Sequence, residues 1–264
     1  MKKKLYAFLF IVVLLLNVSC SNKEEEKIVV GMELAYPPFE MTDNDGNPTG
    51  ISVDMAYDLG KFLGKEIVIE NMAFNGLIPA LQTGKIDLII SSMTITEKRG
   101  EVVNFSKPYA SSYLSLLIYK NSPVITMEDL NQKGRKIAVK KGTTGHIYAT
   151  EYLKDAEIVV FEKESACVLE VSQGRADAFI YDQMTILKNW QANKDTTRAY
   201  LLPFQEDVES WGIAIDKENE AMLKEVNEFI DDYRKNEGFD KLAKKYLAEQ
   251  KKIFDEMNIP FFFK

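Results

Sequence analysis

Short apolar runs alternate with amphipathic stretches along most of the chain. Runs typical of buried strands cover residues 28–30, 67–69, 86–90, 137–139, 158–161 and 178–180. Helices are expected between them, over residues 51–63, 77–81, 145–153 and 166–171. Short strands that alternate with helices predict an α/β protein with mixed, mostly parallel sheets flanked by helices.

This strand–helix pattern occurs twice, so the sequence predicts two lobes. We expect lobe 1 over residues 28–117 and 210–250 and lobe 2 over residues 120–206. The chain would cross between the lobes near 117–120 and return near 206–210. Ligands of open α/β sheets bind at the carboxyl ends of strands, and two facing lobes therefore predict a cleft.

Further elements are expected around the two crossings. Strand-forming segments lie at 113–119 and 211–215, and two long amphipathic helices follow at 218–235 and 238–251. The long helices would complete lobe 1, because they follow the return of the chain.

The first residues have the layout of an export signal. Three lysines precede an apolar run at 5–16, which is too short to span a bilayer comfortably. The segment 1–20 ends at Cys20 and resembles the lipobox of bacterial lipoproteins, although Asn17 stands where an aliphatic residue is usual. We expect lipidation of Cys20, with the charged residues 21–27 as a tether.

Composition narrows the classes of function. The chain has 264 residues, is 46% hydrophobic, and has a net charge of −7, which disfavours broad nucleic-acid binding. One histidine and two cysteines are too few for a structural zinc site. If Cys20 is acylated, Cys167 cannot form an intrachain disulfide, and its apolar neighbours predict a buried structural thiol.

Two motifs follow strands of the first half. Tyr36 lies in Ala-Tyr-Pro-Pro-Phe, a rigid turn after the first strand. Ser91, Ser92 and Thr94 end the buried strand at 86–90, and Arg99 comes soon after. Hydroxyls and a guanidinium at a strand end suit a ligand with a carboxylate, although a strand-end turn with a surface arginine is the ordinary alternative.

Two further motifs lie in the second half. The segment 140–145, Lys-Lys-Gly-Thr-Thr-Gly, opens a helix whose amides suit an anion, but its glycine spacing is not that of a phosphate loop. Asp182 follows the strand at 178–180 and is either a helix N-cap or the partner of a ligand ammonium. His146 has no evident serine or aspartate partner, so a catalytic triad is not supported.

Four segments together, AYPPFE, MAFNGLIPALQTGKIDLIISSMTITEKR, VKKGTTG and GRADAFIYD, resemble the polar-amino-acid family of extracellular solute-binding proteins of ABC importers. The likeness covers about residues 27–250. It implies a two-lobed fold of the periplasmic-binding-protein type with two crossover strands as a hinge. It also implies a free amino acid as ligand, the importer's membrane subunits as partners, and no cofactor or metal. We expect an exported monomer, lipid-anchored in the periplasm or on the outer face of the cytoplasmic membrane.

The resemblance assigns the ligand's two charged groups to residues of different lobes. Arg99 would bind the α-carboxylate, with Thr94 and the backbone around Thr143 and Thr144. Asp182 would bind the α-ammonium, with the carbonyl of Ser92 and the hydroxyl of Thr94. One ligand would then bridge both lobes and shift the population toward closure.

Side-chain selection follows from the same resemblance. Tyr36 and Phe74 would enclose the ligand side chain, and the selecting residues would be Glu33, Ser91, Lys140 and Tyr181. Glu33 either neutralises Lys140 beside a neutral amide, or binds a cationic side chain if Lys140 points away. A large apolar ligand would leave both charges unpaired. We predict a polar amino acid, with glutamine ahead of arginine or lysine.

Two other classes of function are open. Some proteins of this fold are cyclohexadienyl dehydratases, but Asp182 favours an amino acid as ligand, so we expect no enzyme. A sensor ectodomain is disfavoured because no apolar span follows residue 250. The extension at 251–264 passes the family's usual terminus, and we expect residues 259–263 to dock on the protein, since three adjacent phenylalanines would otherwise form an exposed apolar patch.

Overall fold

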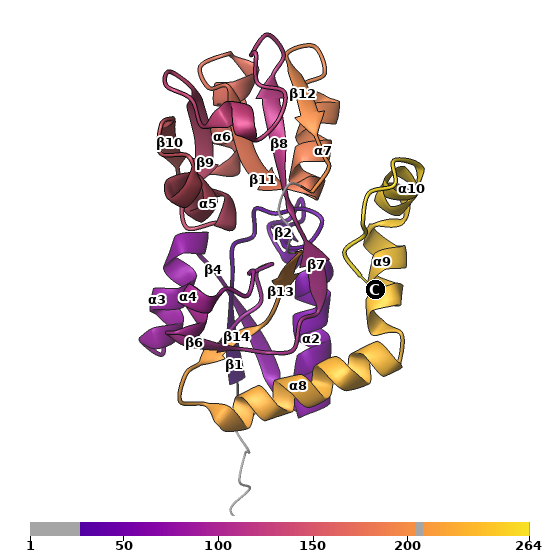
Figure 1. Ribbon diagram of the computed structural model, residues 1–264. Helices are drawn as coiled ribbons and strands as arrows, with labels where there is room; N and C mark the ends of the chain where they lie inside the picture. The colour runs from indigo at the N-terminus through magenta and orange to yellow at the C-terminus, as the bar shows by residue number, and fades with distance from the viewer. Residues whose placement is uncertain (1–26, 204–207, 264) are drawn as a thin grey trace, which may run out of the picture.

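The computed structural model describes residues 27–203 and 208–263, which form two lobes (Figure 1). One lobe is built on a sheet with the order β4-β1-β5-β14-β6 and the other on a sheet with the order β10-β9-β11-β8-β12. The first sheet contains β1 (Lys27–Met32), β4 (Glu66–Asn71), β5 (Leu88–Ile89), β6 (Val103–Phe105) and β14 (Ala214–Asp216). The second contains β8 (Leu114–Tyr119), β9 (Lys136–Lys140), β10 (Glu157–Phe161), β11 (Ala178–Asp182) and β12 (Thr197–Tyr200). The expected signal peptide, Cys20 and most of the tether lie outside the described residues.

Strand direction follows the expected mixed, mostly parallel pattern. β1 pairs in parallel with β4 and β5, and β9 pairs in parallel with β10 and β11. β14 runs antiparallel to both of its neighbours, and β8 does the same in the second sheet. Each sheet therefore has a single reversed strand, which is the strand that follows a crossing between the lobes.

Helices flank both sheets. Those of the first lobe that precede the crossing are α2 (Ile51–Leu63), α3 (Leu77–Gln82) and α4 (Glu97–Gly100). Those of the second lobe are α5 (Thr144–Tyr152), α6 (Glu164–Ser172) and α7 (Gln183–Ala192). The stop signal at Gly64 is confirmed, because this residue ends α2 with a φ of 65°, in the left-handed region that glycine tolerates. Cys167 is buried in α6, as expected.

Two short strands connect the lobes. β7 (Ala110–Ser112) pairs antiparallel with β13 (Glu209–Trp211), and both lie between the sheets (Figure 1). The expected first crossing near 117–120 is wrong, because β8 pairs with β11 and β12 in the second sheet from Leu114 onward. The apolar residues of β8 would be buried equally well in either sheet, so hydrophobicity alone did not locate the crossing.

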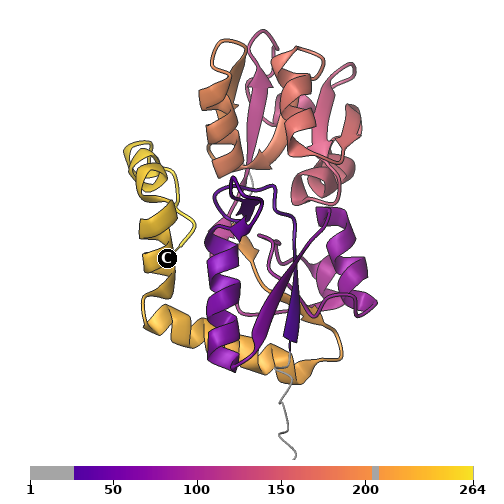
Figure 2. The same ribbon diagram turned by 180° about the vertical axis from the view of Figure 1, so that it is seen from behind.

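The C-terminal region wraps around the first lobe. Its helices are α8 (Glu220–Lys235), α9 (Gly238–Tyr246) and α10 (Ala248–Glu256). Figure 2 shows α8 beneath the lobe and α9 and α10 rising along its side. The single helix expected at 238–251 is broken at Leu247, a fully buried residue with a φ of −125° outside the helical region. The turn at Leu247 lets the tail fold back, and Ile259 and Phe262 are buried, which confirms the expected docking.

Small elements complete the fold. A hairpin of β2 (Met41–Thr42) and β3 (Pro48–Thr49) precedes α2, and 3-10 turns cover Phe74–Gly76 and Glu128–Leu130. No helix among residues 27–203 and 208–263 is both long and apolar enough to cross a membrane.

Candidate functional site

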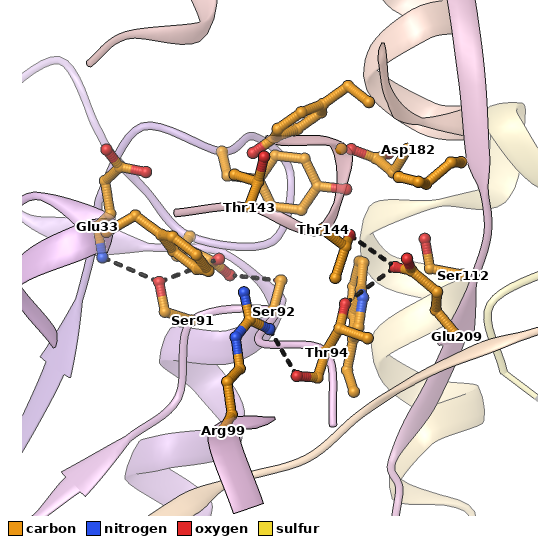
Figure 3. Close-up of a pocket in the computed structure, with 17 residues that line it drawn as sticks. Glu33, Ser91, Ser92, Thr94, Arg99, Ser112, Thr143, Thr144, Asp182 and Glu209 are labelled. Atoms are coloured by element: carbon orange, nitrogen blue, oxygen red, sulfur yellow. Dashed lines mark hydrogen bonds between the residues drawn. The ribbon is translucent and has the colours of Figure 1, made fainter. Parts of the chain in front are cut away.

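A cavity lies between the lobes and is lined by seventeen residues (Figure 3). Eleven of the twelve residues expected at the site line it: Glu33, Tyr36, Phe74, Ser91, Ser92, Thr94, Arg99, Thr143, Thr144, Tyr181 and Asp182. The twelfth, Lys140, does not line the cavity but forms an ion pair with Glu33, which does. Sequence reasoning missed Glu40, Ser112, Leu114, Gly145, Glu209 and Trp211.

The Arg99 guanidinium links the two lobes. Thr96 caps α4 by accepting from the Arg99 backbone amide, which holds this residue at the helix start. The side chain donates to the carbonyl oxygens of Thr94, at 2.6 Å, and Gly142, at 2.9 Å. Burial lowers the pKa of Arg99 to about 10, against the opposing effect of Glu209, so the group stays charged at neutral pH. A guanidinium has five N–H donors, and two carbonyls leave capacity for a carboxylate.

Asp182 is both a helix cap and a wall of the cavity. Its Oδ1 accepts from the backbone amides of Met184, at 2.9 Å, and Thr185, at 3.0 Å, and so caps α7. Burial raises the pKa of this carboxyl, whereas the bond from the Thr185 amide opposes the rise. The helix-cap role considered from the sequence is therefore confirmed, whereas the contact with a ligand ammonium stays a prediction.

Glu33 and Lys140 form an ion pair across the cleft. Lys140 Nζ donates to Glu33 Oε2, and their side chains are only 3% and 14% exposed. The ammonium also lies 5.7 Å from the centre of the Phe74 ring and 5.9 Å from that of Tyr181. Of the two arrangements considered from the sequence, the structure has the one in which Glu33 neutralises Lys140.

Ser91 and Ser92 shape the cavity floor at the end of β5. Ser91 Oγ accepts from the Glu33 backbone amide at 3.0 Å. Ser92 has a φ of 47°, in the left-handed region that residues other than glycine rarely occupy. Such strained conformations cluster at binding sites, where surrounding contacts impose them.

Glu40 is a buried acid that sequence reasoning left without a role. It is 1% exposed, and its Oε2 accepts from Ser52 Oγ at 2.6 Å and Ser92 Oγ at 3.1 Å. Burial raises its pKa to about 8, although the two hydroxyl donors oppose the rise. The carboxyl is therefore mostly protonated at neutral pH and adds little negative charge to the cavity.

This raised pKa predicts a stability that depends on pH. Glu40 ionises near its ordinary value of 4.5 in the unfolded chain but near 8 in the folded protein. Unfolding between these values releases a proton, so the free energy of unfolding should fall as pH rises from about 5 to 8. Urea titrations at pH 5 and pH 8 should show a smaller fall for Glu40→Gln than for the wild type. Equal falls in both proteins would exclude Glu40 as the cause.

Glu209 joins the lobes from the hinge strand β13. Its Oε2 accepts from Thr94 Oγ1 at 3.0 Å and from Thr144 Oγ1 at 3.1 Å (Figure 3). Burial raises the pKa of this carboxyl, against the lowering effect of the two hydroxyl bonds. The residue was missed because it ends a polar segment that looks like a solvated loop. A ligand carboxylate that used the Thr94 hydroxyl would compete with Glu209 for it.

Aromatic rings form one wall of the cavity. Tyr36 stacks on Phe39 with ring centres 5.3 Å apart and meets the edge of Trp211 at 6.0 Å. Phe74 lines the cavity as well, with the Arg99 guanidinium 5.6 Å from its ring centre. These flat, apolar faces suit a ligand side chain of moderate length. Within the described ranges, no three histidine, cysteine, aspartate or glutamate side chains gather in a way that would hold a metal ion.

The sequence of this chain is similar to those of known solute-binding proteins. Residues 28–249 match the model of the family described as bacterial extracellular solute-binding proteins, family 3. A probable histidine-binding protein of Campylobacter jejuni is 33% identical, over 94% of this chain and 100% of that protein. The ABC transporter glutamine-binding protein GlnH of Bacillus subtilis is 31% identical, over 86% of this chain and 83% of that protein.

A solved structure agrees in fold. The ancestral amino acid-binding protein AncCDT-1, a precursor of cyclohexadienyl dehydratase, superposes with a TM-score of 0.75 at 34% identity. The match covers 84% of this chain and 96% of that one. The two-lobed α/β fold class expected from the sequence is thereby confirmed.

Proposed function

Because the chain belongs to the bacterial extracellular solute-binding proteins of family 3, we propose that it binds one free polar amino acid between its lobes and delivers it to an ABC importer. One observation carries the proposal: Arg99 and Asp182, of opposite charge and from different lobes, line the same buried cavity. A buried zwitterion needs a partner for each of its charges, since desolvation would otherwise prevent binding.

In this proposal, each charged group on the α-carbon of the ligand has its own partner in the cavity. Arg99 binds the α-carboxylate, with help from Thr94 and from the amides that open α5 near Thr143 and Thr144. Asp182 binds the α-ammonium through Oδ2. These contacts come from both lobes, so the closed form binds best and the ligand shifts the population toward it. Closure then lets the importer distinguish the loaded protein from the empty one.

The side-chain subsite favours a neutral amide. Glu33 and Lys140 already neutralise each other, which leaves an acceptor and a donor for the two ends of an amide. Glu40 is mostly protonated at neutral pH and offers no strong partner to a cation. Glutamine should therefore bind more tightly than arginine or lysine.

Replacing Lys140 with methionine should change this preference. The variant should lose glutamine affinity by about tenfold or more, the value of a hydrogen bond to a charged group. It should gain affinity for arginine or lysine, because Glu33 is then free to pair with a cation. Calorimetric titration of the three amino acids measures both changes. Lys141→Met is the matched control, since Lys141 is the neighbouring lysine and its ion pair with Glu162 is exposed to solvent. An unchanged order of affinities in Lys140→Met would contradict the assigned role.

Anchoring and export complete the proposal. Cys20 carries the lipid, residues 21–27 form the tether, and the monomer works at the outer face of the cytoplasmic membrane or in the periplasm. Mass spectrometry of the native N-terminal peptide tests the anchor. An unmodified Cys20, or cleavage at another position, would refute it.

Thermal denaturation with each of the twenty amino acids tests the binding function. A ligand that binds only the native state raises the melting temperature by mass action. We expect glutamine to give a clear rise. A protein that responds to none of the twenty would not have this function, and a response to leucine or phenylalanine alone would exclude the polar assignment.

An enzyme is the second candidate, because AncCDT-1 is named as a precursor of a dehydratase. Prephenate lacks an α-ammonium, so it would leave Asp182 without a partner in the cavity, whereas arogenate carries one. Incubation of the purified protein with prephenate and with arogenate distinguishes the two functions. Formation of the aromatic product would establish catalysis, and unchanged substrate would leave binding as the function.

A further inference from the structure

The C-terminal tail lies directly behind the aromatic wall of the cavity. Phe262 is fully buried, and its ring centre lies 5.1 Å from that of Phe39 and 5.4 Å from that of Trp211. Phe39 and Trp211 in turn contact Tyr36, and both Tyr36 and Trp211 line the cavity. Phe262 is not among the lining residues, so it forms a second layer that supports the first.

The tail is also bonded to the hinge. The backbone amide of Ser111 donates to the carbonyl oxygen of Phe262 at 2.7 Å. Ser111 lies in β7, where it is opposite Ser210 of β13, and its neighbour Ser112 lines the cavity. Figure 1 shows the final segment turning back from α10 toward β7. One residue of the extension therefore contacts both the aromatic wall and the strands about which the lobes move.

We propose that Phe262 is a positioning residue of the binding site, which holds Phe39 and Trp211 in place behind the ligand and so sets ligand affinity. Protein interiors are close-packed, and a void behind Trp211 would let the wall relax away from the cavity. The inference rests on the proposed amino-acid binding, because affinity is what Phe262 is expected to control.

The same tail provides a matched control. Phe263 stacks on Phe239 of α9, with ring centres 5.6 Å apart, whereas Phe262 contacts Phe39 and Trp211. Replacing Phe262 or Phe263 with alanine removes the same group from the same segment. Both variants should lose stability, but only Phe262→Ala should disturb the cavity wall.

The first readout is affinity, measured by calorimetry with glutamine and with arginine at a temperature where every variant is folded. Phe262→Ala should bind about tenfold more weakly than the wild type, as expected for coupled neighbours in contact. Phe263→Ala should bind normally, and Phe262→Leu should recover most of the affinity, because it restores apolar volume. Equal affinities in Phe262→Ala and the wild type would overturn the proposal.

The second readout is independent of the ligand. The chain contains two tryptophans, so Trp190→Phe leaves Trp211 as the single tryptophan, which can be excited selectively over tyrosine. In this background Phe262→Ala should shift the emission of Trp211 to longer wavelength, and Phe263→Ala should not. Binding of no amino acid by the wild type would refute the proposed function, whereas an unshifted Trp211 emission in Phe262→Ala would overturn the positioning role.

Discussion

Replacing Arg99 with alanine should weaken binding of the cognate amino acid by about 2–5 kcal/mol, because the ligand carboxylate would be buried without a partner. Arg99→Lys should recover only part of the loss, since an ammonium keeps the charge but not the two-pronged geometry. Calorimetric titration measures both variants. Lys98→Ala, at the exposed neighbouring position, is the control and should bind normally. Near-normal affinity in Arg99→Ala would refute the role of Arg99.

The equivalent test of Asp182 needs a variant that keeps the helix cap. Asp182→Ala should lose a similar amount of binding energy, but it would also cost about 1 kcal/mol of stability through the cap of α7. Asp182→Asn keeps an oxygen for the amides of Met184 and Thr185 and removes the charge. A normal melting temperature with strongly reduced affinity in Asp182→Asn is the expected result. Retained affinity in this variant would contradict the ammonium contact.

Deleting residues 252–264 should cause the largest loss of stability. The deletion removes Phe254, Ile259 and Phe262, which are all buried, and uncovers Phe39 and Trp211. Loss of the Phe262 side chain alone is expected to cost about 3–5 kcal/mol. The melting temperature should fall by about 6–20 °C on that basis.

A substitution at an exposed position of the same segment is the control, because it should not affect stability if burial of the tail is what stabilises the fold. Met257 is 42% exposed, so Met257→Ala should leave the melting temperature within a degree or two of the wild type. An unchanged melting temperature in the deletion variant would mean that the tail serves a partner instead of the fold.

Much of the fold followed from hydrophobic patterning. The strands β1, β9 and β11 and the helix α2 were predicted correctly, because burial on one or both faces requires apolar residues at regular positions in the sequence. β7 and β12 were missed, since their sequences Ala-Ser-Ser and Thr-Arg-Ala-Tyr contain no apolar run. Their pairing comes from the tertiary arrangement of the lobes, which local sequence does not encode.

The residues of the candidate site were also only partly predictable from the sequence. Residues at strand ends, such as Ser91, Thr94 and Asp182, were found because the carboxyl edge of a sheet is a predictable place for ligand groups. Glu40 and Glu209 were missed because an acid in a sequence is usually solvated, and only the packed structure reveals the burial that raises their pKa values. The Glu33–Lys140 pair was anticipated as one of two arrangements, and the structure decided between them.

The most direct test of the central claim is a calorimetric titration of the wild type with the amino acid that gives the largest thermal shift, alongside its decarboxylated and deaminated analogues. Binding of the intact amino acid, with both analogues weaker by a hundredfold or more, is the result predicted by two buried charge contacts of about 3 kcal/mol each. Comparable affinity for either analogue would contradict the account, because Arg99 or Asp182 would then contribute nothing to recognition.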